Sequence, residues 1–293
     1  MEFRTSVVIG RPTFQIEPLE EMLFVGSCFA DSIGQRFAEE RFAATVNPYG
    51  TMYNPASVLH TIERYLAEHE SYCPRTVFMT LGTNHVYRLK ETGEIVDNCQ
   101  KRPQRLFDEE RLSIDECADY LRQAINLLTA RNQDVNVVLT VSPIRYQKYG
   151  FHESQLSKAT LLLAVEQVIW SGRTNPVDVR RDSSRPTPVD VRRDSSRPYY
   201  FPAYEIVLDE LRDYRFYKED MLHPSAQAVE YIWQQLVEYC LSPSAKLFLK
   251  EWKSIKEALG HRPFHPESEE DKLFLADARQ REKELLRRFT SCR

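Results

Sequence analysis

Gly26-Ser-Cys-Phe-Ala-Asp31 joins a short apolar run to an amphipathic helical pattern. Residues 22–25 are uninterrupted apolar side chains, typical of a buried strand, and apolar residues recur every fourth position from Phe29 to Phe37, as on one face of a helix. Ser27 is therefore predicted to lie in a strand-to-helix turn. The N–H groups that begin a helix lack intrahelical acceptors, so an oxyanion forming beside this serine would meet hydrogen-bond donors. A simpler role also fits, because serine is a favoured N-cap.

A second motif, Asp220-Met-Leu-His-Pro-Ser225, puts a carboxylate three residues before a histidine and just ahead of another helical pattern. We expect Asp220 to accept the ring N–H of His223 and to orient the imidazole. Pro224 suits the first position of a helix, which predicts that His223 lies at the helix entrance. The alternative is a surface turn whose histidine only caps the helix. Taken together, the two motifs predict that His223 removes the proton of Ser27.

The order of nucleophile, aspartate and histidine, with the last two nearly adjacent, resembles the SGNH (GDSL-type) hydrolase superfamily. Residues 26–30 look like the signature that names the GSCFA domain family. The resemblance covers most of residues 1–240. Further matching stretches are 47–50, 53–55, 80–83, 98–99, 140–143 and 156–159.

The resemblance implies a flavodoxin-like three-layer α/β/α sandwich with a parallel sheet. It also implies that Ser27 is the nucleophile, His223 the base and Asp220 the group that orients the base.

An oxyanion hole is implied as well. Its donors would be the N–H of Ser27, the N–H of Gly50 and an asparagine side chain. Asn84 fits the general spacing of the superfamily, and Asn98 is the rival.

Strand-like and helix-like patterns alternate along the chain, which favours a parallel, doubly wound sheet. Strand-like runs occupy 22–25, 77–81, 135–141 and about 199–202. Helical patterns occupy 29–42, 55–69, 115–130, 154–170 and 225–240. Such sheets bind ligands at the carboxyl ends of their strands, and Ser27, Gly50 and Asn84 each fall in or near a segment that follows a strand-like run or a turn.

The composition indicates a soluble enzyme with one large domain, because 293 residues with 42% hydrophobic content can bury a substantial core. The net charge of −4 and the pI near 6.0 give no electrostatic footprint for nucleic acid, so we expect no such partner. No stretch approaches the length of a membrane-spanning helix, and the N-terminus lacks the pattern of a secretory signal. We therefore expect a cytoplasmic protein without a membrane partner.

No cofactor is predicted, because no glycine-rich phosphate loop, dinucleotide fingerprint or Gly-x-Ser-x-Gly elbow occurs. His261 and His265 have a nominal metal-ligand spacing, but Pro263 keeps them from sharing a helix face, and no metal site is predicted. The six cysteines show no paired spacing and are expected to be free thiols. Cys28 follows Ser27 at a helix N-terminus, where a thiol is activated, yet we predict a packing role for it.

An exact repeat occurs late in the chain, where residues 176–186 recur as 188–198. Its arginines, aspartates, serines and prolines bury little apolar surface, which predicts an exposed loop over 173–198. We therefore predict a catalytic domain over 1–242 that carries this loop, followed by a helical extension over 243–293.

The extension combines an amphipathic pattern over 247–259 with a charged helix from about 268 to 289. Apolar side chains on the charged helix are expected to pack on the core or on another subunit. We therefore expect self-association through the C-terminal helices.

These observations favour a serine hydrolase that removes a small acyl group, such as acetyl, from a carbohydrate or a related metabolite ester. An acyltransferase of the same fold is one alternative. A ligand-binding protein that retains the scaffold without catalysis is the other.

Overall fold

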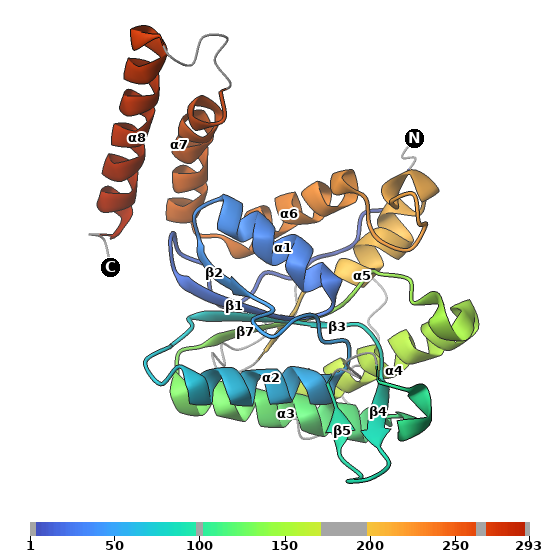
Figure 1. The fold of residues 1–293 in the computed structure, drawn as a ribbon. Helices are drawn as coiled ribbons and strands as arrows, with labels where there is room; N and C mark the ends of the chain where they lie inside the picture. The colour runs from blue at the N-terminus through green and yellow to red at the C-terminus, as the bar shows by residue number, and fades with distance from the viewer. Residues whose placement is uncertain (1–3, 98–101, 171–197, 262–267, 291–293) are drawn as a thin grey trace, which may run out of the picture.

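The computed structural model describes residues 4–97, 102–170, 198–261 and 268–290. A five-stranded parallel sheet lies between two layers of helices (Figure 1). Its strands, in the order in which they lie side by side, are β2 (Ala43–Val46), β1 (Glu21–Gly26), β3 (Thr76–Leu81), β7 (Asn136–Val141) and β8 (Tyr199–Tyr200). Numbered along the chain within this sheet, the order is 2-1-3-4-5, which is the flavodoxin-like order. The predicted three-layer α/β/α sandwich is confirmed.

The helices are α1 (Cys28–Glu39), α2 (Pro55–Glu68), α3 (Ile114–Arg131), α4 (Gly150–Trp170), α5 (Ala203–Glu205), α6 (Ala226–Cys240), α7 (Pro243–Leu259) and α8 (Glu269–Thr290). A π-helical turn follows α5 at Ile206–Leu211, and short 3-10 helices occupy Gln104–Leu106, Gln147–Tyr149 and Tyr214–Phe216. The predicted helices and strands therefore lie within a few residues of observed ones. The repeat loop predicted over 173–198 lies outside the described residues except for Pro198.

Two hydrophobic cores lie on the two faces of the sheet, because successive residues of a strand point to opposite faces. Leu23 and Val25 of β1 pack in the core formed with α2, α3 and α4. Met22 and Phe24 of the same strand pack in the core formed with α1, α5 and α6. Figure 1 shows these two sets of helices on opposite sides of the sheet. Since both faces are covered, the strands are continuous apolar runs, as parallel strands usually are.

A second, antiparallel sheet is a feature that the sequence patterns did not predict. Its strands, in spatial order, are β5 (Ile95–Val96), β4 (His85–Leu89) and β6 (Phe107–Arg111). Their side chains are mostly half-buried or exposed, so they lack the apolar signal of the central strands. β2 was missed for the same reason.

The start of α6 corrects one prediction about the histidine motif. Ser225 is the N-cap, with its Oγ accepting from Ala228 N at 3.3 Å, so the helix begins at Ala226 and not at Pro224. Pro224 instead bridges Tyr217 in antiparallel fashion. A serine satisfies helix N–H groups that a proline cannot, which moves the helix start two residues onward and leaves His223 in a loop.

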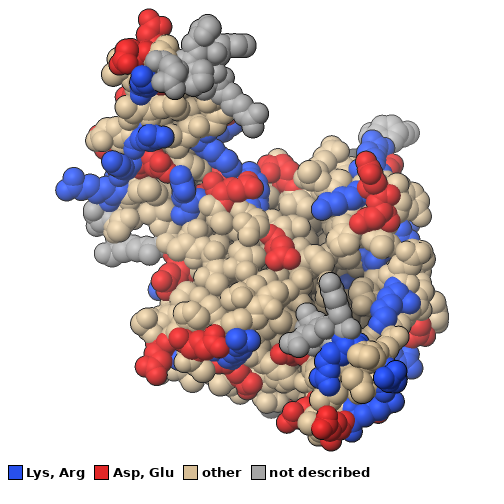
Figure 2. All heavy atoms as spheres, viewed as in Figure 1, with Lys and Arg blue, Asp and Glu red and all other residues tan. Residues whose placement is uncertain are grey.

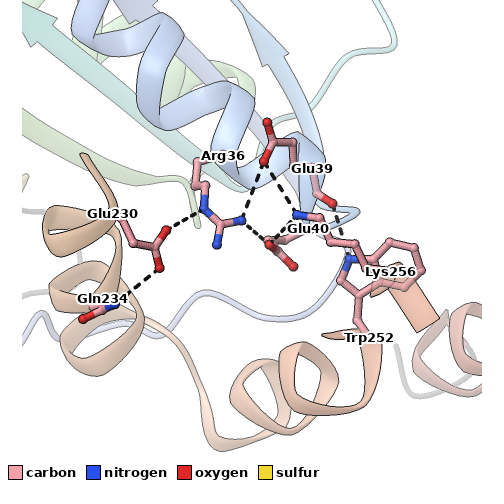
Figure 3. Close-up of polar contacts among 7 residues, drawn as sticks. All are labelled: Arg36, Glu39, Glu40, Glu230, Gln234, Trp252 and Lys256. Atoms are coloured by element: carbon pink, nitrogen blue, oxygen red, sulfur yellow. Dashed lines mark hydrogen bonds and ion pairs between the residues drawn. The ribbon is translucent and has the colours of Figure 1, made fainter. Parts of the chain in front are cut away.

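The C-terminal extension is anchored to the first helix by a polar network that Figure 3 shows. Lys256 of α7 lies 2.9 Å from a carboxylate oxygen of Glu40, and Trp252 Nε1 donates to Glu39 O at 3.3 Å. Arg36 of α1 contacts the same Glu40 and also Glu230 of α6, the latter at 3.1 Å. The three helices are thus joined at one point, while Phe248 and Trp252 pack in an apolar cluster with α8.

The surface carries both signs of charge. On the face in Figure 2, Lys and Arg are interspersed with Asp and Glu, including over the protruding C-terminal helices. Among the helices of the described residues, none has the length and apolar character needed to cross a membrane.

Candidate active site

Ser27 lies between β1 and α1, as the sequence predicts, and is the N-cap of the helix. Gly26 precedes it with φ of 140°, a conformation that favours glycine. A Cβ at Gly26 would lie 2.1 Å from the carbonyl oxygen of Thr80 on β3. The glycine therefore allows β1 and β3 to approach where the chain turns into the helix.

The hydroxyl of Ser27 is enclosed by the end of β3. Its Oγ lies 3.1 Å from Thr80 Oγ1 and accepts from Phe29 N at 3.3 Å. A Cβ placed on Gly82 would lie 3.5 Å from Ser27 Cβ, so Gly82 is a close neighbour of the serine. The residue is only 1% exposed, so the predicted nucleophile presents almost no surface to solvent.

Asp220 and His223 form a hydrogen-bonded pair on the loop before α6. His223 Nδ1 lies 2.6 Å from Asp220 Oδ2. The other carboxylate oxygen, Oδ1, accepts from the backbone N–H of His223 at 2.9 Å and of Leu222 at 2.8 Å. These two backbone donors, followed by the imidazole, lower the pKa of Asp220 to about 2. The carboxylate is thus ionised, and it holds both the ring and the backbone of the histidine.

The histidine loop is attached to the end of β7. Arg145 N donates to Leu222 O at 3.0 Å, and its guanidinium donates to Met221 O at 3.0 Å. The end of β7 is one strand from β3, which lies next to β1, so the loop belongs to the sheet edge at which Ser27 lies. Within the described residues, Ser27 Oγ is bonded to Thr80 and Phe29 and makes no hydrogen bond to His223.

The predicted oxyanion donors are engaged in backbone contacts. Ser27 N donates to Thr80 O at 3.0 Å, and Gly50 N donates to Asn47 O at 2.8 Å. Asn84 Nδ2 donates to Leu112 O at 2.7 Å, where it joins the start of β4 to the end of β6. Each of these three N–H donors would have to break its hydrogen bond to a carbonyl oxygen before it could bind an oxyanion. Asn98, the rival asparagine, lies outside the described residues.

Asn47 is a structural residue of the site whose role sequence reasoning missed. Its Oδ1 accepts from Gly26 N at 2.9 Å, and its Nδ2 donates to Asp31 Oδ1 at 2.7 Å. The side chain therefore fixes both ends of the turn that carries Ser27. The only signal in the sequence is the Asn-Pro-Tyr-Gly block at 47–50, which does not reveal a partner.

Ser157 and Lys158 of α4 were also missed as site residues. Ser157 Oγ accepts from Asn84 N at 2.9 Å, and Lys158 Nζ donates to Gly82 O at 2.7 Å. Both belong to the buried face of α4. The sequence signal is a polar pair in helical register with apolar residues such as Leu161 and Val165.

The packing role expected for Cys28 remains a prediction. Cys28 is half-buried, and its Sγ lies 3.5 Å from the hydroxyl of Tyr53. Cys28, Cys73, Cys117 and Cys240, the cysteines in the described part of the chain, are all free thiols. In the part of the chain that the structure describes, no three or more His, Cys, Asp or Glu side chains lie close enough together to hold a metal ion.

The model of the GSCFA family matches residues 21–76 and 73–236, which is more than half of the chain. The chain belongs to the GSCFA family. A second model, that of the C-terminal domain of GSCFA domain proteins, matches residues 252–292 of this GSCFA chain. No curated protein matches the chain.

Solved structures with some likeness to this GSCFA protein include an acetyl esterase mutant with acetate ion, at 12% identity and a TM-score of 0.39 over 79% of this chain and 99% of that one. A putative platelet activating factor from Streptococcus pneumonia has 14% identity and a TM-score of 0.44 over 76% and 84% of the two chains. A carbohydrate esterase family 3 protein from Talaromyces cellulolyticus has 11% identity and a TM-score of 0.38 over 78% and 98%.

Proposed function

We propose that this GSCFA protein is a serine esterase in which Ser27, His223 and Asp220 cleave a small acyl ester. The observation that supports it most is the state of His223. Its Nδ1 is held by an ionised carboxylate, while its Nε2 has no hydrogen-bond partner among the described residues. An imidazole oriented in this way can accept a hydroxyl proton at the open nitrogen. The resemblance of the motifs to SGNH hydrolases implies the same roles.

In the proposed reaction, Ser27 Oγ attacks the ester carbonyl carbon as His223 Nε2 takes the hydroxyl proton. The tetrahedral intermediate collapses, the bond to the alcohol oxygen breaks, and His223 returns the proton to that oxygen. Water then transfers a proton to His223 and attacks the acyl-enzyme, which releases the carboxylic acid and restores Ser27. Asp220 remains ionised in each step because its pKa is lowered to about 2.

For the oxyanion we propose the backbone N–H of Cys28 as a donor. Cys28 is the first residue of α1, so its N–H has no intrahelical acceptor, and it makes no other hydrogen bond within the described residues. The positive end of the helix dipole favours an anion at this position. Unlike the N–H of Ser27, this group need not give up a carbonyl.

The enclosure of Ser27 favours a small acyl group. Thr80 and Gly82 lie against the serine, and the serine is 1% exposed. We therefore propose an acetyl or similarly small ester of a carbohydrate or related metabolite as the substrate. A series of acetyl, butyryl and octanoyl esters of one alcohol tests this choice, with the highest kcat/KM expected for acetyl.

The decisive experiment is labelling of the intact protein with a fluorophosphonate probe, followed by mass spectrometry of the modified peptide. We expect labelling at Ser27 that is lost in Ser27→Ala and His223→Ala and retained in Cys28→Ala. Absence of labelling in the folded wild-type protein, together with no hydrolysis of any ester in the series, would contradict the proposal.

A further inference from the structure

Lys158 is a buried lysine whose amine lies between two strands of the central sheet. It lies on α4, is 2% exposed, and its Nζ donates to Gly82 O at 2.7 Å and to Ser142 O at 2.8 Å. Gly82 directly follows β3 and Ser142 directly follows β7. One side chain therefore joins the carboxyl ends of two adjacent strands, at the edge of the sheet that carries the candidate active site.

The first of these contacts leads to Ser27. Gly82 is the close neighbour of the serine, and its own N–H is fixed by Tyr53 O at 2.8 Å. Ser157, next to Lys158, accepts from Asn84 N and contacts Thr83 Oγ1 at 3.0 Å. Two consecutive residues of α4 thus hold the whole turn that encloses the serine.

The second contact leads to His223. Ser142 begins the segment that ends at Arg145, and Arg145 carries the histidine loop through its bonds to Leu222 O and Met221 O. A displacement of Ser142 would therefore move the histidine relative to the serine. Lys158 lies at the junction between the serine side and the histidine side of the site.

Stability alone gives no reason for a lysine here. Among the described residues, Lys158 has no carboxylate partner, and the nearest ring contact is Tyr204 at 6.0 Å. Burial without a counter-charge disfavours the ammonium form and lowers the pKa of Lys158 to about 7. An apolar side chain would fill the same space without the free-energy cost of burying an amine. Within the described residues, the two hydrogen bonds are therefore the only property of this position that requires a lysine.

We propose that Lys158 is a positioning residue of the esterase, and that its bonds to Gly82 O and Ser142 O set the distance between Ser27 and His223. The inference rests on the proposed function. A displacement of about 1 Å between reacting groups can reduce turnover on the order of 10²-fold, so loss of this bridge should slow the chemical step more than it weakens substrate binding.

The experiment compares Lys158→Met, which retains the packing volume without donors, with Lys158→Ala, which leaves space for an added amine. Lys250→Met on the exposed surface of α7 is the control for loss of a lysine. For each protein we would measure kcat, KM, the rate of fluorophosphonate labelling and amide hydrogen exchange. Lys158→Ala would also be assayed with increasing ethylammonium.

In Lys158→Met we expect kcat and the labelling rate to fall on the order of 10²-fold with KM unchanged. Hydrogen exchange should become faster in residues 80–84 and 142–146 and remain unchanged elsewhere. Ethylammonium should restore turnover of Lys158→Ala, and Lys250→Met should match the wild type. Unchanged hydrogen exchange in both segments would overturn the inference. So would a loss of turnover that matches the loss of folded protein and that ethylammonium does not restore.

If the protein is not an esterase, these measurements give a different pattern of results. If the wild-type protein neither labels nor hydrolyses esters, the esterase proposal fails, and hydrogen exchange alone decides the role of Lys158. Faster exchange confined to the two segments would support its positioning role at this sheet edge. Unchanged exchange would overturn it.

Discussion

Ser27 Oγ lies 3.1 Å from Thr80 Oγ1, and both groups are buried at the carboxyl ends of adjacent parallel strands. Thr80 is paired in register with Thr140 on β7, whose hydroxyl is also buried but has no hydrogen-bond partner. The same residue type thus makes different contacts on the two adjacent strands. Thr80 contacts the predicted nucleophile, and the hydroxyl of Thr140 contacts no polar group among the described residues.

Thr80→Val should reduce fluorophosphonate labelling of Ser27, because the serine hydroxyl loses the group that holds it. Thr140→Val is the matched control and should leave labelling unchanged. Since it removes a buried hydroxyl without a partner, it should leave the unfolding free energy the same or raise it by about 1 kcal/mol. Labelling rates and urea denaturation check both variants, and equal labelling in the two would contradict the orienting role of Thr80.

Cys28→Pro should remove the proposed oxyanion donor while the helix is retained. Proline is tolerated at the first helical position, and the preceding residue, Ser27, has φ of −65° and ψ of 173°, which suits a residue before proline. We expect turnover to fall on the order of 10²- to 10³-fold, as for other lost oxyanion donors.

Cys28→Ala is the control for this change because it keeps the N–H and removes the same thiol contact with Tyr53. It should retain most of the turnover. Circular dichroism checks that Cys28→Pro is folded. A folded Cys28→Pro with the same turnover as Cys28→Ala would show that the N–H of residue 28 is not the oxyanion donor.

Asp220→Asn should reduce turnover by roughly 10³- to 10⁴-fold, because an amide cannot hold the imidazole in the same tautomer or stabilise its protonated form. Asp213→Asn is a suitable control, since Asp213 lies in the same loop region and also accepts a backbone N–H, that of Arg215 at 2.9 Å. Kinetics on the two purified variants check the prediction. A loss of the same size in Asp213→Asn would indicate a general disturbance of the loop.

The unfolding free energy should rise with pH between about 7 and 10 because of Lys158. Its folded pKa of about 7 lies below the ordinary value of 10.5, so over this range the unfolded chain binds a proton that the folded chain does not. The slope contributed by the lysine approaches about 1.4 kcal/mol per pH unit. Burial raises the pKa of Tyr204, whose ring centroid lies 6.0 Å from Lys158 Nζ, so the tyrosine stays neutral over the same range.

Urea denaturation of the wild type and of Lys158→Met at several pH values checks this dependence. The difference between the two curves isolates the lysine, since other groups titrate equally in both proteins. The wild type should gain stability relative to the variant as the pH rises. Parallel curves would mean that Lys158 keeps an ordinary pKa.

Self-association through the C-terminal helices remains a prediction. Leu273 and Phe274 at the start of α8 are 69% and 46% exposed, which leaves apolar area for a second subunit. Replacing both by serine should convert a dimer to a monomer in light scattering and leave the apolar cluster around Phe248 and Trp252 intact. A wild-type protein that is already monomeric at high concentration would refute the prediction.

Local patterns were sufficient for the main elements of the sandwich. The apolar run at 22–25 and the fourfold spacing from Phe29 to Phe37 correspond to β1 and α1, because buried strands and helix faces depend on side chains near in sequence. The small antiparallel sheet escaped prediction because its strands are half-exposed. Its position depends on Asn84 and Leu112, which bond to each other only after the chain has folded.

The sequence by itself determined that a serine would cap a helix after a buried strand, and that Asp220 would hold His223, since each relation spans three residues or fewer. Only the tertiary structure decided that the N–H of Ser27 is already engaged, because its acceptor, Thr80 O, comes from another strand. It also decided the contacts of Lys158, whose Nζ bonds to residues 76 and 16 positions away in the chain. Hydrogen bonds across such separations depend on how the strands are ordered in the sheet, and local periodicity carries no record of that order.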